Sequence, residues 1–352
     1  MGIPGIPAHA LLYNIYNIIA TLIRAFYDFV FIFFTLLQEN SYSIVNYQLY
    51  IIKKEERVVI DISSEEDFAG ILESLQAKGL HLVSEPLPLF IGGVQINLFH
   101  ENSTLPALFH PSFLCGNYIV EPKECNIYLN ERRFNIEPQL CNREAYPVRK
   151  GESIMASDIY ISLSDYKRKK CTAMVLENLP ADDLLTIVRW LMPPFLIDFQ
   201  ILPIHASGII HKEKGILFIG HSGAGKSTVA RLSTPRKVLS DECVLIKKDG
   251  DAFTAYGTPF GREDKGENIH APLYAIMDLK KDSRDYLRPL PFHARLNLIM
   301  KHLWTSTIPK ANLKLLLNLA VDIARVTPAY ELHFKKESTF WNVIDEQIFS
   351  HI

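Results

Sequence analysis

A glycine-rich stretch between two apolar runs restricts the fold of this chain more than any other segment. Residues Gly220–Ser227 match the pattern G-x-x-x-x-G-K-[ST] at every fixed position. The run Ile216–Ile219 before it is short and apolar, as in a buried parallel strand, and Thr228–Leu232 after it is expected to begin a helix. This strand–loop–helix context predicts a phosphate-binding loop.

Each residue type in the loop has a role in binding a nucleotide. Gly220, Gly223 and Gly225 allow positive φ angles and leave room for phosphate groups, while backbone N–H groups and the following helix N-terminus attract the anion. Lys226 is expected to reach the β- and γ-phosphates, and the Ser227 hydroxyl to ligate Mg²⁺. The predicted nucleotide-binding residues of the loop are Gly220, His221, Ser222, Gly223, Ala224, Gly225, Lys226, Ser227 and Thr228.

Two adjacent carboxylates follow the loop after a short interval. The apolar run Val238–Ile246 contains Asp241 and Glu242 and is expected to form a strand that brings them close to the loop. One carboxylate can accept the proton of an attacking hydroxyl while the other holds a metal ion. No LSGGQ-like segment, as in transport-type ATPases, is present. The alternative is an acidic pair on the surface at a strand end.

A histidine lies a short distance before the loop. His205 belongs to the run Leu202–Ile210, and a hairpin from Ile204–His211 to Gly215–Ile219 would return it to the phosphate-binding loop. The alternative for a single histidine of this kind is a packed polar residue without a role in chemistry.

Other local patterns predict the elements that surround the loop. The runs Tyr47–Ile52 and Val58–Ile62 indicate a strand pair, and Tyr160–Ser164 with Ala173–Leu176 indicates a second hairpin. The segment Ala181–Phe199 is expected to be a helix that Asp182 or Asp183 caps and that Pro193–Pro194 interrupts.

Three of these segments together resemble the catalytic domain of bacterial HPr kinase/phosphorylase. They resemble more closely the HPr-kinase-like proteins of peptide and natural-product gene clusters, in the superfamily that also contains ATP-dependent phosphoenolpyruvate carboxykinase. The segments are His205–Ser207, Gly220–Thr228 and Leu239–Glu242, and the runs Ala271–Leu279 and Thr327–Phe334 resemble later strands of that group. The resemblance covers residues 157–350.

The resemblance implies an α/β fold with a β-rich core and helices packed around it. Residues 157–352 would form a P-loop ATP-binding catalytic domain like that of HPr kinase and phosphoenolpyruvate carboxykinase. Residues 41–156 would form a smaller α+β accessory domain, and residues 1–40 a hydrophobic N-terminal helical segment.

The same resemblance assigns roles to single residues. Asp241 falls on the general base or acid, and Glu242 falls on a metal-linked position where the family usually has Asp. His205 falls on a histidine near the active site. Arg262 lies where a substrate loop is expected and either clamps a phosphate or is a surface arginine. The capping segment E-I-R-G and the basic phosphorylase loop of HPr kinase are not recognisable.

These residues imply an ATP- and Mg²⁺-dependent kinase that transfers the γ-phosphoryl group to a hydroxyl, such as a serine of a protein or peptide. The catalytic residues would be Asp241, His205 and Lys226, and the metal ligands Ser227 and Glu242. A small-molecule kinase and a nucleotide-binding regulatory protein without transfer activity are the alternatives. Related kinases are often oligomers, so a homo-oligomer is expected by analogy.

The apolar residues of the chain are concentrated near its N-terminus. Between Ala8 and Leu37 the only charged residues are Arg24 and Asp28, and a helix of this length would exceed a bilayer core. Three interpretations are open: a membrane-spanning or membrane-embedded helix, a helical hairpin packed on the protein or on a second subunit, and a start codon assigned too early. A spanning helix followed by Lys53 and Lys54 would keep the remaining chain on the cytoplasmic face.

The composition of the chain as a whole excludes several classes of protein. With 37 Lys and Arg against 39 Asp and Glu in 352 residues, it is not expected to coat nucleic acid. The hydrophobic share of 48% excludes extensive disorder. Five cysteines without a C-x-x-C pair indicate free thiols in a cytoplasmic protein rather than disulfides or a zinc site. The expected partner is a protein, peptide or small-molecule acceptor.

Overall fold

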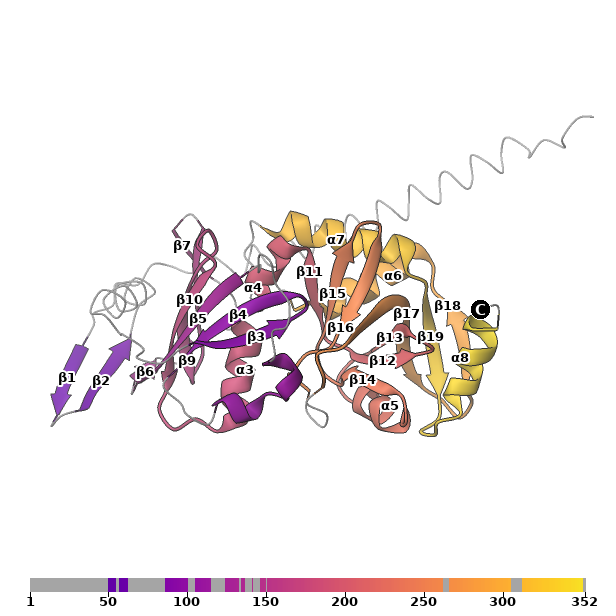
Figure 1. Ribbon diagram of the computed structural model, residues 1–352, viewed down its shortest axis with the longest axis horizontal. Helices are drawn as coiled ribbons and strands as arrows, with labels where there is room; N and C mark the ends of the chain where they lie inside the picture. The colour runs from indigo at the N-terminus through magenta and orange to yellow at the C-terminus, as the bar shows by residue number, and fades with distance from the viewer. Residues whose placement is uncertain are drawn as a thin grey trace, which may run out of the picture. The chain divides into compact units, whose positions relative to one another are not determined.

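Two large β-sheets and a small one form the framework of the part of the chain that the computed structural model describes (Figure 1). The structure describes residues 50–54, 57–62, 86–100, 105–114, 124–132, 134–136, 141, 146–149, 151–261, 266–304 and 312–350, all within the unit Gln48–Ile352. The predicted hydrophobic segment at residues 1–40 and Arg262 lie outside them. In the described part of the chain, no helix is both long enough and apolar enough to cross a membrane.

The small sheet contains the first predicted strand pair. Its strands are β1 (Tyr50–Lys54), β2 (Arg57–Ile62) and β6 (Phe134–Ile136). β1 and β2 are antiparallel as far as the pair Lys54–Arg57, and β2 runs parallel to β6. The strand pair is therefore confirmed, with β1 continuing two residues beyond the predicted end at Ile52.

The seven-stranded sheet joins segments from both sides of residue 156. Its order is β3 (Leu87–Ile91), β4 (Val94–Phe99), β5 (Glu124–Arg132), β10 (Lys170–Leu176), β9 (Tyr160–Asp165), β8 (Glu152–Ala156) and β7 (Tyr146–Arg149). The predicted hairpin is confirmed as β9 and β10, which are antiparallel. The division expected between residues 156 and 157 thus falls between two paired strands, β8 and β9.

The predicted helix over Ala181–Phe199 is divided into three short helices. They are α3 (Ala181–Leu191), α4 (Pro193–Leu196) and a 3-10 helix at Ile197–Phe199. The interruption is where the sequence predicts it, because Pro193 begins α4 and a proline offers no N–H to the preceding helix. The predicted caps are wrong: Pro180 is the N-cap, without a side-chain hydrogen bond, and Asp182 and Asp183 lie in the first turn.

The nine-stranded sheet contains the phosphate-binding loop. Its order is β11 (Ile201–Ile204), β15 (Val244–Asp249), β16 (Ala252–Tyr256), β17 (His270–Lys281), β13 (Lys214–Ile219), β12 (Ser207–His211) and β14 (Lys237–Ser240). Beyond this path, β19 (Ala329–Phe334) pairs with β17 and with β18 (Tyr286–Pro289). Strand β13 is parallel to β17 and antiparallel to β12.

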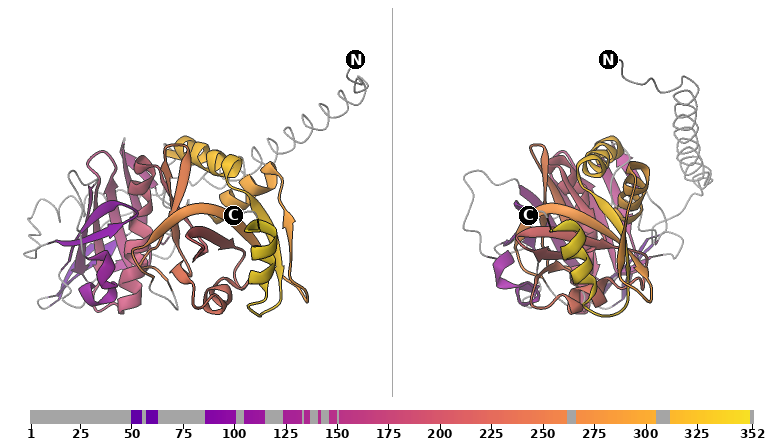
Figure 2. Two further views of the ribbon diagram at one scale, coloured as in Figure 1. Left: turned by 45° about the vertical axis from the view of Figure 1, so that its right-hand side comes forward. Right: turned by 90° about the vertical axis from the view of Figure 1, so that its right-hand side faces the viewer.

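Helices cover both faces of the nine-stranded sheet. In Figures 1 and 2, α6 (Phe292–His302) and α7 (Leu313–Val326) lie on one side and α5 (Lys226–Leu232) on the other. The side chains of β13 alternate between two cores, with Leu217 and Ile219 in the core under α6 and α7. Ile216 and Phe218 lie in the core under α5 and α8 (Phe340–Ile348). The described fold is thus mixed α/β, as expected.

Candidate active site

The loop Gly220–Gly225 connects the end of β13 to the start of α5. Gly223 and Gly225 have φ angles of 76° and 116°, in the region that favours glycine. A Cβ on Gly225 would come within 2.9 Å of the Phe334 ring, whereas a Cβ on Gly223 would meet no atom within 4 Å. The loop therefore needs glycine at both positions for its backbone, and its backbone at Gly223 faces open space.

Lys226 is buried at the first position of α5 and points back to the loop. Its Nζ donates to the carbonyl oxygen of Gly220 at 3.0 Å and to that of His221 at 3.5 Å. Ser227 and Thr228 are partly exposed, and His221 and Ser222 are exposed. The ammonium group is thus held at the loop by two of its carbonyl groups.

The acidic pair and the loop lie at the same edge of the nine-stranded sheet. Gly208 of β12 is opposite Leu217 of β13 on one side and Ser240 of β14 on the other. Because β13 and β14 are both antiparallel to β12, their C-terminal ends meet at one edge, about 10 Å apart across two strand spacings. Asp241 follows β14 as the loop follows β13, so the structure brings the predicted acids and the predicted loop together.

A tight turn holds the two acidic residues. The Ser240 hydroxyl accepts hydrogen bonds from the N–H groups of Glu242 (3.3 Å) and Cys243 (3.2 Å), a side-chain turn that fixes the backbone between them. The Ala206 N–H donates to the Glu242 carbonyl at 3.2 Å. Asp241 is 1% exposed and Glu242 is 7% exposed. The pair is therefore buried, and the alternative of a surface acidic pair is wrong.

The neighbouring cysteine is not suited to act as a nucleophile. Cys243 is fully buried, and this burial raises the pKa of its thiol to about 12. A cysteine needs its thiolate form to react, and a pKa of this size leaves almost none at neutral pH.

His205 lies beside Glu242. The predicted hairpin is confirmed for Ser207–His211 and Lys214–Ile219, with Ser207 opposite Phe218, whereas Ile204 ends β11, which pairs with β15. The His205 N–H donates to the His302 carbonyl at 2.8 Å, and its Nδ1 is 3.5 Å from Oε1 of Glu242. The structure therefore brings His205 to the acidic pair, through Glu242.

Two residues at this site have no signal in the sequence. Nη1 of Arg189, in the last turn of α3, is 3.8 Å from the same Oε1 of Glu242. The Arg189 guanidinium carbon lies 5.0 Å from the ring centroid of Trp304, which stacks on Trp190 at 5.8 Å. Residues so distant in sequence meet only through tertiary packing, so no local pattern could have identified them.

The segment that contains Arg262 begins and ends beside β14. The Thr258 N–H donates to the Leu239 carbonyl at 3.3 Å, and a Cβ on Gly266 would meet that same carbonyl at 2.6 Å. The described ends of this segment are thus close to the acidic pair, although Arg262 itself lies outside the described residues.

The donor atoms near the loop suit a hard divalent cation. Glu242 offers a carboxylate and Ser227 a hydroxyl, both oxygen ligands of the kind that Mg²⁺ prefers. Among the described residues, no group of three or more His, Cys, Asp or Glu side chains is arranged to hold a metal ion. Mg²⁺ commonly uses one or two protein carboxylates together with phosphate oxygens and water, so this donor set fits a nucleotide-bound ion.

The region that contains this site is similar to one family of known proteins. A family model described as "ScmC: SynChlorMet cassette protein ScmC" matches residues 182–350. Its range begins in α3 and ends after α8, so it includes the loop, the acidic pair, His205 and Arg189.

The comparison with solved structures gives a weaker similarity. The chain is similar to the HPr(Ser) kinase/phosphatase from Coxiella burnetii, with 11% identity and a TM-score of 0.25, over 42% of this chain and 89% of that one. A TM-score this low does not establish a shared fold. The comparison with curated proteins returned no match.

Proposed function

We propose that the chain is an ATP- and Mg²⁺-dependent phosphotransferase of the HPr-kinase-like type, which transfers the γ-phosphoryl group to a hydroxyl group. The acceptor we propose is a serine side chain of a protein or peptide. The observation that most supports this proposal is that a complete G-x-x-x-x-G-K-S loop and a buried acidic pair leave two strands of one sheet at the same edge.

Lys226 and the loop backbone would bind the phosphates. The Lys226 ammonium, which now donates to the carbonyls of Gly220 and His221, would turn to the β- and γ-phosphates, while loop N–H groups donate to their oxygens. Ser227 and Glu242 would hold Mg²⁺, which when bound reduces the negative charge of the phosphate oxygens.

Asp241 would act as the general base. As the acceptor oxygen forms its bond to the γ-phosphorus, the bond from that phosphorus to the β–γ bridging oxygen breaks, and ADP leaves. The hydroxyl proton passes to the Asp241 carboxylate. Asp241 is buried, and the Ser240 hydroxyl fixes the backbone of the turn around it, which would hold its carboxylate in position as a proton acceptor.

His205 would act on Glu242 rather than on the substrate. Its Nδ1 contacts Oε1 of Glu242 at 3.5 Å, and its backbone is tied to the end of α6 by the bond to His302. These contacts favour a role in orienting the carboxylate that holds the metal ion.

Asp241→Asn tests the proposal. We expect this variant to bind Mg·ATP as the wild type does and to transfer phosphoryl groups about 100- to 10,000-fold more slowly, the usual contribution of a general base. Transfer would be followed with γ-labelled ATP and separated protein, peptide and small-molecule fractions of a cell extract. Asp249→Asn is the control, because Asp249 lies at the exposed end of β15.

Each outcome of this experiment selects one function. Full transfer by Asp241→Asn overturns the base assignment. Label in the small-molecule fraction alone would identify a small-molecule kinase instead. Mg·ATP binding by the wild type without label in any fraction would indicate a nucleotide-binding regulatory protein, and absence of ATP binding would overturn the proposal as a whole.

A further inference from the structure

Arg189 reaches the site from outside the nine-stranded sheet. It lies in the last turn of α3, whose buried residues, among them Leu184 and Val188, pack in one core with Leu89 of the seven-stranded sheet. That core also contains Leu245 of β15, so the packing of α3 is continuous with the sheet that contains the acidic pair. The side chain of Arg189 is mostly buried, and its Nη1 is 3.8 Å from Oε1 of Glu242.

Trp304 supports the guanidinium group of Arg189. The ring centroid of Trp304 lies 5.0 Å from the guanidinium carbon, within the range of a cation–π contact. Trp190 stacks on Trp304 with an interplanar angle of 24°. The backbone N–H of Trp304 donates to the carbonyl of Pro203 at 3.2 Å, which ties the main chain at Trp304 to the end of β11, next to His205.

Glu242 is thus contacted by two cationic or potentially cationic groups from different elements. Arg189 comes from α3 and His205 from the connection between β11 and β12, and both approach Oε1. A planar guanidinium that stacks on a ring has one preferred orientation, whereas a lysine ammonium has none. This arrangement restricts the carboxylate more than a point charge would.

We propose that Arg189 is a positioning residue that orients the Glu242 carboxylate for the divalent cation, with Trp304 as its support. The inference deepens the proposed function and rests on it. Its consequence is that the site is composite: α3, which packs with the seven-stranded sheet, supplies a residue that the loop of the nine-stranded sheet needs for metal-dependent nucleotide binding.

The test compares ATP binding with and without Mg²⁺ in the full chain. Arg189→Lys keeps the charge and removes the planar stack, so it separates geometry from electrostatics. We expect it to weaken Mg·ATP binding about 10-fold, as loss of a group that orients a metal ligand does. ATP binding in EDTA should change less than about twofold. Calorimetric titration measures both, and Arg168→Lys is the control, because the Arg168 side chain is 80% exposed.

Two further variants keep the test decisive. Trp304→Leu removes the ring below the guanidinium and should give the same selective loss. Glu242→Gln should remove the Mg²⁺-dependent gain, and Arg189→Lys added to it should cause no further loss, because both changes act through one carboxylate.

The results separate this inference from the proposed function. Equal losses with and without Mg²⁺ in Arg189→Lys and Trp304→Leu would reduce Arg189 to a packing role and overturn the inference. Unchanged binding in both variants, while the wild type binds Mg·ATP, would overturn it and leave the proposed function intact. Failure of the wild type to bind ATP would overturn both.

Discussion

At the turn end of the β12–β13 hairpin, His211 is enclosed by α8 and by the segment before β14, whereas the other end continues into the loop Gly220–Gly225. The His211 Nε2 is 2.8 Å from Oδ1 of Asp345, and its Nδ1 accepts a hydrogen bond from Nε of Arg236 at 2.8 Å. Lys212 contacts the same Asp345 oxygen at 2.6 Å. Every charge in this cluster has a partner on another element.

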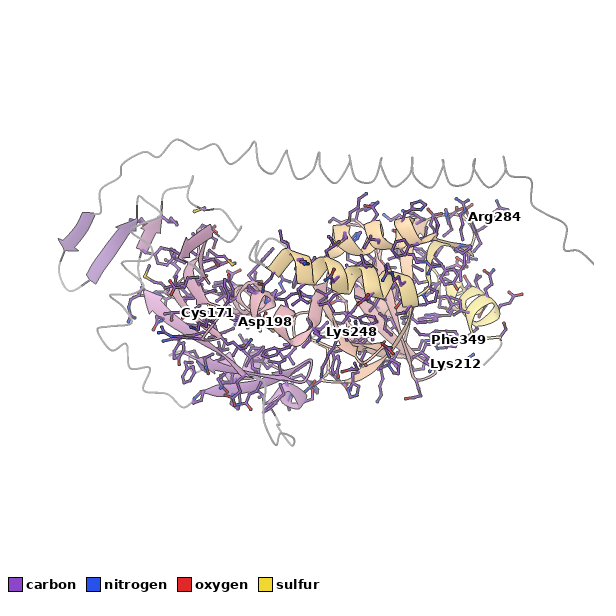
Figure 3. All side chains as sticks on the ribbon, turned by 90° about the horizontal axis from the view of Figure 1, so that it is seen from above. Cys171, Asp198, Lys212, Lys248, Arg284 and Phe349 are labelled. Carbon is purple, nitrogen blue, oxygen red and sulfur yellow. The ribbon has the colours of Figure 1, made fainter. Side chains whose placement is uncertain are left out.

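Aromatic rings complete the enclosure at the turn end. Trp341 packs against His211 at 4.8 Å and against the Arg236 guanidinium at 4.0 Å. Phe349 packs edge-on against His211, and its ring faces the ammonium group of Lys212. Figure 3 labels Phe349 and Lys212 next to each other.

At the loop end of the hairpin, backbone groups take the place of the side chains that hold the charges at the turn end. There the cation of Lys226 is held by carbonyl groups of its own loop, and the backbone at Gly223 faces open space. Side chains close one end of the hairpin, whereas at the other end a Cβ on Gly223 would meet no atom within 4 Å. We therefore expect substitutions at the turn end to change stability and substitutions at the loop end to change binding.

Trp341→Ala should give the largest effect on stability. Trp341 is 2% exposed, packs with Phe218 and Phe340, and donates from Nε1 to the Ser233 hydroxyl at 3.2 Å. Its truncation should cost about 3–5 kcal/mol of the free energy of unfolding, measured by urea denaturation. The folded variant should bind ATP normally, and a loss below about 1 kcal/mol would contradict the enclosure of His211 by α8.

Gly225→Ala should give the largest effect on binding among backbone changes. An alanine at this position would have to adopt a φ of 116°, and its Cβ would meet the Phe334 ring at 2.9 Å. The strain, about 1–3 kcal/mol, should displace the loop and weaken ATP binding roughly 10-fold, as a calorimetric titration would show.

Gly250→Ala is the matched control for this change. Gly250 also has a positive φ, 63°, but lies in the turn between β15 and β16, where a Cβ would meet no atom within 4 Å. It should lower stability slightly and leave ATP binding unchanged. Equal losses of ATP binding in the two variants would show that the backbone geometry of the loop does not determine ATP affinity.

Asp345→Asn should have a smaller effect that depends on pH. Burial alone would raise the pKa of Asp345, but the hydrogen bonds from Lys212 and His211 outweigh it and lower the pKa below the ordinary value of 3.8. The wild type should therefore be more stable than the variant at neutral pH, by about 0.5–1 kcal/mol because the pair is partly exposed to water.

The pH dependence of that difference has a fixed sign. For a carboxyl whose pKa is lowered on folding, the stabilisation is complete above the unfolded pKa and is lost as the pH falls through the folded pKa. The two proteins should thus converge in stability only under acidic conditions. A difference that disappears as the pH rises from 5 to 8 would assign the effect to another group.

The buried thiols should give the smallest effect, an absence of reaction. Burial raises the pKa of Cys125, Cys171 and Cys243 to about 12. An alkylating reagent at neutral pH should leave all three unmodified in the folded chain and react with them in denaturant, as mass spectrometry would record. Rapid modification of Cys243 alone would show that the turn with the acidic pair opens in solution.

The local part of the site could be predicted from the sequence. The glycine-rich loop, Lys226 and the flanking strand and helix depend on residues close together in the chain. The closeness of Asp241 to the loop was predicted, but the single strand expected over Val238–Ile246 is wrong: β14 ends at Ser240, β15 begins at Val244, and the acids lie in the turn between them.

The remaining features depend on tertiary packing. Arg189 meets both Glu242 and Trp304 because α3 packs beside β11 and β15 and the chain after α6 is bonded to β11, and no periodicity encodes these contacts. The pairing of β8 with β9 across residue 156 likewise depends on how the sheet assembles, and the composition of the two segments does not predict it. The prediction that Asp182 or Asp183 caps α3 is wrong because the N-cap position is already occupied by Pro180, which places both aspartates in the first turn.

The central claim, that the loop end binds a nucleoside triphosphate, is tested most directly by calorimetric titration of Mg·ATP into the wild type and Lys226→Ala. We expect the wild type to bind and Lys226→Ala to bind roughly 10- to 100-fold more weakly, the cost of losing a charged hydrogen bond to phosphate. Lys237→Ala, on the exposed start of β14, should bind as the wild type does. Equal affinity of Lys226→Ala and the wild type, or no binding by either, would contradict the claim.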